Sequence, residues 1–327
     1  MKLLVEKFNF QLKDALKIGE SANLKKTTKK FKNVVITGLG GSGIGGKIVS
    51  QLVQDKVTVP ININNDYSLP AYVDDHTLLI ASSFSGNTEE TLSALSKAME
   101  KGAEIACITS GGKLAQIAKD NNYNHIILPT ERSPRAMLTY SLVQQFYLLH
   151  HYDFIDSSFK KDIENAITLL DKELATIKEK AHEVALSLHH KTAVLYSDSA
   201  FEGVTTRLRQ QINENAKALC WHHVVPEMNH NELVGWAGGK NEYAVVVLRS
   251  SFDHPRTKLR LNISKEIISK YTSVYFEIEA KGNSKTEQAL FLILFGDWVS
   301  VYLSELYQVD SIEVNVIDYL KKELSKI

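Results

Sequence analysis

Short apolar runs alternate with longer segments over the first 130 residues of the chain. Continuous runs of four to five apolar residues are typical of strands buried on both faces of a parallel sheet, and the segments between them are long enough for helices. We expect strands at residues 34–37, 59–63, 78–81, 105–108 and 125–128, with helices at 44–53 and 88–99 between them. The alternation predicts a doubly wound α/β domain.

The strand–helix alternation resumes in the second half, after two consecutive helical segments at residues 134–152 and 159–186. Beyond them we expect strands at 193–196, 243–248 and 274–278, and helices at 202–219, 258–269, 286–306 and 314–324. We place a domain boundary near residue 155, which divides the chain into residues 1–155 and 156–327. The predicted fold class is α/β, with two tandem α-β-α sandwich subdomains whose sheets are mainly parallel and doubly wound.

Charge and composition narrow the class of protein. The chain has 327 residues with 38 Lys+Arg and 38 Asp+Glu, so it lacks the basic excess that nucleic-acid binding normally needs. The most apolar stretch, residues 289–303, is interrupted by Asp297 and predicts a buried helix rather than a membrane span. The two cysteines, Cys107 and Cys220, have no paired spacing that would suggest a disulfide framework or a zinc ribbon. We expect a cytoplasmic, globular protein that binds neither nucleic acid nor a membrane.

A glycine-rich turn follows the first predicted strand. Residues 38–46 contain six glycines, and the segment opens a helix whose free amides favour an anion. The spacing from Gly38 to Gly43 matches a dinucleotide-binding fingerprint, with Asp66 after the second strand as a partner for a ribose. A P-loop is excluded, because Ile48 stands where that motif needs a serine or threonine. The turn therefore predicts an anion site, and the dinucleotide interpretation stays open.

A second strand-to-helix turn, after the third predicted strand, is dense in hydroxyl groups. Ser83, Ser85 and Thr88 can converge on one phosphate together with the free amides of the next helix, and Gly86 permits the bend. The alternative is that these residues only cap the helix. Capping needs a single hydroxyl, so we favour phosphate binding.

These motifs resemble those of sugar isomerase (SIS) domains, and more narrowly those of the bifunctional phosphoglucose/phosphomannose isomerases. Five segments carry the resemblance, in order and with similar spacing: residues 38–46, 83–90, 134–140, 213–217 and 227–232. Phe84 and Thr139 replace residues that are usually tyrosine and glycine in the family. Residues 310–314 are less typical and provide no recognisable counterpart of a threonine that the family places near the sugar. The resemblance implies two tandem SIS subdomains.

The resemblance also implies a reaction and a set of site residues. Aldose–ketose isomerisation needs a base that moves a proton between C1 and C2, a cation for the enediolate, and an acid–base pair that opens the ring. By resemblance, Glu214 is the base and Arg135 the cation, while His230 opens the ring with Lys321, or alternatively Lys322. The phosphate of a hexose 6-phosphate would bind to Gly40, Gly41, Ser42, Ser83, Ser85 and Thr88. No cofactor or metal is implied, and the histidine would come from the neighbouring subunit of a homodimer.

Other interpretations stay open on sequence alone. Glu214 also fits a solvated charge on a helix, and Arg135 a surface arginine. A group of polar residues could instead bind a metal, although its spacing fits no standard zinc motif: His222, His223, His230 and Glu232. For the whole protein, the alternatives are a non-catalytic sugar-phosphate sensor, which would not need Glu214 or His230, and a nucleotide-dependent oxidoreductase.

Overall fold

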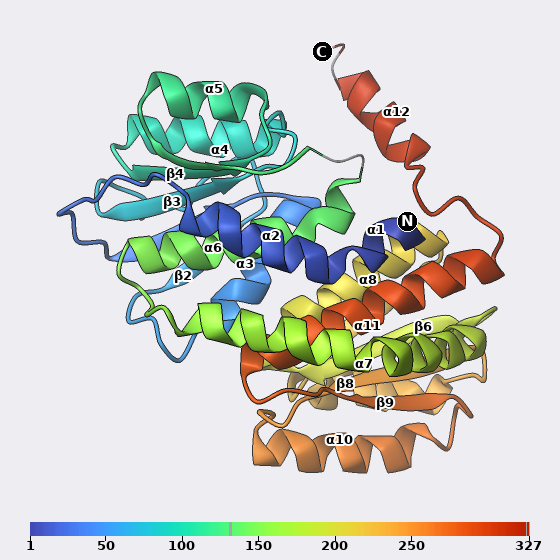
Figure 1. Ribbon diagram of the computed structural model, residues 1–327. Helices are drawn as coiled ribbons and strands as arrows, with labels where there is room; N and C mark the ends of the chain where they lie inside the picture. Colours follow the sequence, from blue (N-terminus) through green and yellow to red (C-terminus); the bar gives the residue numbers. More distant parts are fainter. Residues whose placement is uncertain (131–132, 325, 327) are drawn as a thin grey trace.

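The first half of the chain forms a five-stranded parallel sheet in the order β2-β1-β3-β4-β5 (Figure 1). The computed structural model describes residues 1–130, 133–324 and 326. The strands are β1 (Asn33–Thr37), β2 (Ile61–Asn64), β3 (Thr77–Ser82), β4 (Glu104–Thr109) and β5 (Asn124–Ile127). Alternate residues of each strand face opposite sides, so Val34 and Ile36 pack toward α3 (Gly40–Leu52) and α6 (Leu138–His151). Val35 packs on the other face, which is covered by α4 (Glu89–Glu100) and α5 (Gly112–Asp120).

The second half forms a four-stranded parallel sheet in the order β7-β6-β8-β9. Its strands are β6 (Thr192–Asp198), β7 (Trp221–Val225), β8 (Tyr243–Arg249) and β9 (Tyr275–Glu279). One face packs against α10 (Pro255–Ile268), and the short elements η3 (Glu227–His230), α9 (Glu232–Gly235) and η4 (Trp236–Gly238) follow β7. The α/β class with two tandem parallel sheets, predicted from the alternation, is confirmed.

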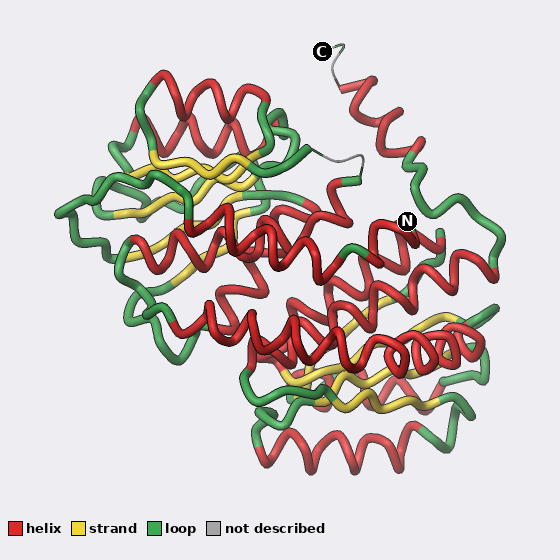
Figure 2. Tube along the Cα trace, in the orientation of Figure 1, coloured by secondary structure: helices red, strands yellow, loops and turns green. Residues whose placement is uncertain are grey.

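A layer of helices lies between the two sheets and joins them into one core (Figure 2). It contains α2 (Phe8–Glu20), α6, α7 (Ser158–Leu188), α8 (Glu202–Ala216) and α11 (Lys285–Leu306), and α1 (Lys2–Glu6) packs against α11. By length and composition α11 could cross a membrane. However, 83% of its most apolar 18-residue stretch is buried inside the protein, as expected for a core helix. The predicted boundary near residue 155 falls in the loop between α6 and α7, while α2 packs against both of these helices.

Several segments differ from the sequence prediction. Helix α3 begins at Gly40 rather than at residue 44, so most of the glycine-rich turn is helical. Residues 134–137 form a 3-10 turn, η1 (Pro134–Met137), instead of the start of an α-helix. Helix α8 ends at Ala216 because Lys217 adopts a left-handed conformation, with φ +56°. The unpredicted strand β7 follows directly after that turn.

The C-terminal helix α12 (Asn315–Leu324) projects from the rest of the molecule (Figure 1). Its side chains are largely exposed, including those of Val316, Tyr319 and Leu320. The segment before it, residues 309–313, returns across the end of α8 and brings the C-terminal region to the candidate site.

Candidate active site

The two predicted phosphate loops meet at the point where the strand order of the first sheet reverses. Strands β1 and β3 are neighbours, and the remaining strands extend from them to opposite sides, β2 from β1 and β4–β5 from β3. Ligands of open α/β sheets bind at such a switch point, outside the carboxyl ends of the strands. The hydroxyl of Ser42, in the first turn of α3, accepts a hydrogen bond of 3.1 Å from the amide of Phe84 in the second loop. This bond ties the two loops together.

The hydroxyl-rich loop is built around Ser83. Its hydroxyl lies 2.9 Å from that of Thr88 and accepts a bond of 3.1 Å from the amide of Gly86. The hydroxyl of Ser85 accepts from the amide of Asn87 at 3.2 Å, and its side chain is exposed. Thr88 precedes α4 but makes no side-chain capping bond to it. The helix-capping interpretation therefore does not describe this loop, and the first amides of α4 are not occupied by that side chain.

The glycine-rich turn packs closely against the segment that carries Arg135. Gly40 has φ +52°, which suits glycine. A Cβ atom at Gly41 would lie 3.3 Å from the carbonyl oxygen of Pro134 and 3.4 Å from the Cα of Arg135. Gly41 thus allows α3 to approach η1 closely. A cavity of about 300 Å³ lies between α3 and α8, and its lining includes Gly40, Lys47, Thr206 and Arg209.

Asp66, the proposed ribose partner of the dinucleotide interpretation, lies exposed after β2. Its carboxylate accepts from the amide of Tyr67 at 2.6 Å. The side chain that reaches the glycine-rich turn from this strand is that of Asn65, which donates to the carbonyl oxygen of Gly38. An amide in this position does not provide the carboxylate that reads a ribose hydroxyl in dinucleotide-binding folds.

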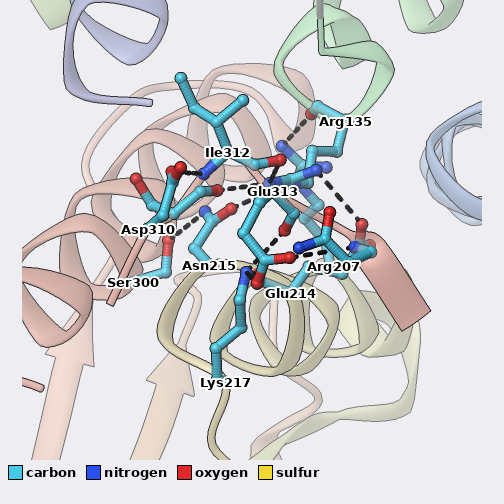
Figure 3. Close-up of polar contacts among 11 residues, drawn as sticks. Arg135, Arg207, Glu214, Asn215, Lys217, Ser300, Asp310, Ile312 and Glu313 are labelled. Atoms are coloured by element: carbon cyan, nitrogen blue, oxygen red, sulfur yellow. Dashed lines mark hydrogen bonds and ion pairs between the residues drawn. The ribbon is translucent and has the colours of Figure 1, made fainter. Parts of the chain in front are cut away.

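Arg135 and Glu214 lie side by side at the junction of the two halves (Figure 3). The Arg135 side chain is 6% exposed, and its Nη1 lies 3.6 Å from Oε2 of Glu214, whose side chain is 30% exposed. Burial lowers the pKa of Arg135, and the neighbouring Glu214 carboxylate opposes that shift. Arg135 is therefore a buried cation that faces a carboxylate, and the interpretation as a free surface arginine is wrong.

The rest of the guanidinium is held by groups that the sequence did not identify. Nε donates to Oδ1 of Asn215 at 2.8 Å, and Nη2 donates to the carbonyl oxygens of Ser311 and Ile312. Lys217 fixes the same C-terminal segment, because its Nζ donates to the Glu313 carbonyl at 2.7 Å and pairs with the Glu313 carboxylate. Asn215 and Lys217 lie in segment 213–217, which carries the family resemblance, but neither of them was assigned a role from the sequence.

His230 and Lys321 are not brought to this pair within one chain. His230 is exposed in η3, and Lys321 is exposed on α12. Neither forms a hydrogen bond or ion pair with Arg135 or Glu214 in the part of the chain that the structure describes.

Of the four residues considered as metal ligands, His223 and Glu232 contact each other, while His222 has a partner elsewhere. His222 Nε2 lies 3.1 Å from the hydroxyl of Thr206, and burial lowers the pKa of this histidine. His223 Nδ1 lies 3.0 Å from Oε2 of Glu232, while Oε1 of Glu232 accepts from the side chains of Tyr196 and Trp221. Across residues 1–130, 133–324 and 326, no three His, Cys, Asp or Glu side chains are grouped as a metal site. The contacts of Glu232 attach the turn that carries His230 to the second sheet.

Comparisons with known proteins identify the family. One family model, described as "SIS domain", matches residues 29–152, and another, "Bacterial phospho-glucose isomerase C-terminal SIS domain", matches residues 177–324. Relatives named "Bifunctional phosphoglucose/phosphomannose isomerase" include one from Caldicellulosiruptor bescii, 39% identical over 97% of this chain and 96% of its own, and one from Aquifex aeolicus, 35% identical over 94% and 95%.

The fold is also found in a solved structure, the C-terminal domain of glucosamine-fructose-6-phosphate aminotransferase from Francisella tularensis. Its TM-score is 0.76 at 13% identity, and the match covers 94% of this chain and 96% of that one. At this identity the likeness concerns the fold alone. The full-length sequence relatives carry the functional assignment, and the chain belongs to the family of bifunctional phosphoglucose/phosphomannose isomerases, which are aldose–ketose isomerases.

Proposed function

We propose that this enzyme interconverts glucose 6-phosphate and mannose 6-phosphate with fructose 6-phosphate through a cis-enediolate, with Glu214 as the base. The observation that carries this proposal is the pairing of Glu214 with the buried guanidinium of Arg135 at 3.6 Å, on the segment packed against the glycine-rich turn. A base and a cation at one position are what proton transfer next to a carbonyl group requires.

The phosphate binds between the two loops at the switch point. Neutral hydroxyls of Ser42, Ser83, Ser85 and Thr88 and the first amides of α3 and α4 supply the donors. Binding the phosphate at this fixed position holds C1 and C2 at a constant distance from the loops. The remote phosphate thereby orients the reacting carbons.

Glu214 removes the proton from one carbon and returns it to the other on the same face of the enediolate. The negative charge that develops on the two oxygens is stabilised by Arg135, which burial prevents from being fully solvated. One side chain serves both directions, so the aldose and the ketose are interconverted without a redox step.

Ring opening uses His230 and Lys321, and His230 comes from the second subunit of a homodimer in the cytoplasm. Two features support an assembly: His230 is exposed in an anchored turn, and α12 exposes an apolar face that contains Val316, Tyr319 and Leu320. Both cysteines are free, as is usual in a reducing compartment.

Replacing the base tests the mechanism. The variant Glu214→Gln keeps the size of the side chain and removes its basicity, so kcat should fall by about 10³-fold or more while fructose 6-phosphate still binds. Proton NMR in D₂O with the wild-type protein should show glucose 6-phosphate, with deuterium at C2, and mannose 6-phosphate as products. Full activity of the variant would contradict the assigned base, and binding without any turnover by the wild type would favour a sensor.

Mixing two inactive variants tests the shared site. A heterodimer of Glu214→Gln and His230→Ala subunits contains one intact site if the histidine crosses the interface, so random reassociation should restore roughly a quarter of the wild-type activity. No recovery, with heterodimers demonstrated by mass spectrometry, would place both residues in sites of single subunits.

A further inference from the structure

A buried ion pair, Arg207–Asp297, lies behind the candidate active site. The two side chains are 2% and 4% exposed, and two contacts of 3.2 and 3.1 Å join Nε and Nη2 of Arg207 to the Asp297 carboxylate. Such a pair does not in general stabilise a fold more than packed apolar side chains would, because both charges lose their hydration. Another role therefore has to be sought in what the pair contacts.

Arg207 also binds the backbone of Arg135. Its Nη2 donates to the Arg135 carbonyl oxygen at 2.7 Å, which ties α8 to the 3-10 turn η1. On another side of the same residue, the Cβ position of Gly41 lies 3.4 Å from the Arg135 Cα. The backbone of Arg135 is thus fixed both by the ion pair and by the glycine-rich turn.

A second connection fixes the guanidinium itself. Asn215 accepts from Arg135 Nε and donates through Nδ2 to the hydroxyl of Ser300 at 2.9 Å. Ser300 in turn donates to the carbonyl oxygen of Asp297 at 2.7 Å. Arg207 and Asn215 lie on α8, and Ser300 lies on α11 (Figure 3). Asp297 also lies on α11, three residues before Ser300, so both connections end on the same turn of this core helix.

These contacts leave one nitrogen of the guanidinium for the reaction. An arginine has five N–H donors. One on Nε is bound by Asn215, and the two on Nη2 are bound by the carbonyl oxygens of Ser311 and Ile312. Among the residues that the structure describes, Nη1 forms no hydrogen bond, and it lies 3.6 Å from the Glu214 carboxylate.

We propose that Arg207, Asp297 and Asn215 are positioning residues that hold Arg135 so that its Nη1 faces the enediolate. The inference rests on the proposed role of Arg135 and adds to it the means by which one donor is selected. Asp297 also neutralises Arg207, so that the active-site cation does not face a second uncompensated positive charge.

The first experiment replaces the ion pair by apolar side chains of similar size, in the double variant Arg207→Met/Asp297→Leu. If the ion pair positions Arg135, Tm should be preserved or raised, because packed apolar side chains can replace a buried ion pair without loss of stability. At the same time kcat should fall by about 100-fold, with KM changed less than threefold, because a displacement of about 1 Å has such an effect on rate. The control is Thr205→Val, which removes another buried polar contact of α8, to Ser197, and should leave kcat unchanged. Unchanged kcat in the double variant would overturn the proposal.

A second experiment separates positioning from a general structural effect. Adding Arg207→Met/Asp297→Leu to Arg135→Ala should cause no further loss of kcat, because the pair acts only through Arg135. A further tenfold loss would overturn the proposal. If the double variant does not fold, Asn215→Leu and Asn215→Asp extend the test. Only the aspartate keeps an acceptor for Arg135 Nε, so Asn215→Asp should retain the higher kcat. Equal losses of kcat in the two variants would count against positioning. If Arg135→Ala alone keeps wild-type kcat, the role of Arg135 in the proposed function fails first.

Discussion

The two sheets share a topology, but their switch points differ chemically. Strands β6 and β8 are neighbours in the second sheet as β1 and β3 are in the first. At the end of β6, however, stands Asp198, whose carboxylate accepts from the Ala200 amide at 2.9 Å. Asp253 follows β8, is 4% exposed, and accepts from the amide of Ser250. Hydroxyls follow the strands at both switch points, since Ser250 and Ser251 come directly after β8, but the second switch point adds two buried carboxylates.

This difference supports the proposal that the phosphate binds in the first half. Burial raises the pKa of Asp253 to about 6, and the nearby Asp198 carboxylate adds to the shift. A phosphate placed there would meet two acids. Each of the two sheets has a switch point, and the residues at the strand ends determine what each switch point can bind.

Introducing an acid into the first switch point should have the largest effect. In Ser85→Asp, an exposed hydroxyl of the phosphate loop becomes a carboxylate, and repulsion of the substrate phosphate should lower kcat/KM for fructose 6-phosphate by about 100-fold or more. The neutral variant Ser85→Asn, which has nearly the same size, is the control and should lose far less. Equal losses in the two variants would mean that size, rather than charge, matters at this position.

The backbone of the phosphate loop is the next target. Gly86 has φ +69°, and a Cβ there would lie 1.8 Å from the carbonyl oxygen of Gly111. Gly86→Ala should lower the free energy of unfolding by about 3 kcal/mol, from strain and overlap together. Gly102→Ala is a matched control, since its φ is +74° but the nearest atom is 3.7 Å away, and it should lose only about 1 kcal/mol. Urea denaturation measures both, and equal losses would contradict the steric argument.

The smallest effect concerns Asp253 and depends on pH. The pKa of an aspartate in the unfolded chain is about 4, whereas that of Asp253 in the folded protein is about 6. Between these two pH values the folded protein binds one more proton than the unfolded chain, so stability falls as the pH rises through this window. Above about pH 6 the loss of stability is constant. Asp253→Asn should therefore stabilise the protein by about 2 kcal/mol at pH 7.5, with the difference vanishing toward pH 4.

The control for this variant is Asp75→Asn, at a carboxylate that is 72% exposed. It should show no such pH-dependent gain when unfolding is measured at pH 4.5, 6 and 7.5. A constant difference between Asp253→Asn and the wild type at all three values would rule out titration of Asp253 as the cause.

The sequence predicted the strands well because most of them are buried on both faces and appear as apolar runs. Strand β7 was missed for two reasons: it contains His222 and His223, and no glycine marks the left-handed turn at Lys217 that ends the preceding helix. Helix α2 was also not predicted, although Phe8, Leu12 and Ala15 repeat at helical spacing.

The candidate site was predictable to different degrees. Both phosphate loops follow predicted strands, so local sequence locates them at one edge of the sheet. The Arg135–Glu214 pair joins segments far apart in the chain, and only the family resemblance suggested it. Asp297 interrupted an apolar run and so marked an unusual buried charge, but no spacing rule links it to Arg207, its partner 90 residues away.

The position of α1 has a consequence for protein synthesis. Lys2 pairs with Glu305, 303 positions later in the chain, and α1 rests on α11. As the polypeptide leaves the ribosome, α1 cannot dock until α11 has emerged. The helical layer between the sheets is therefore completed only after α11 has been synthesised, and the apolar residues of α1 stay uncovered until then.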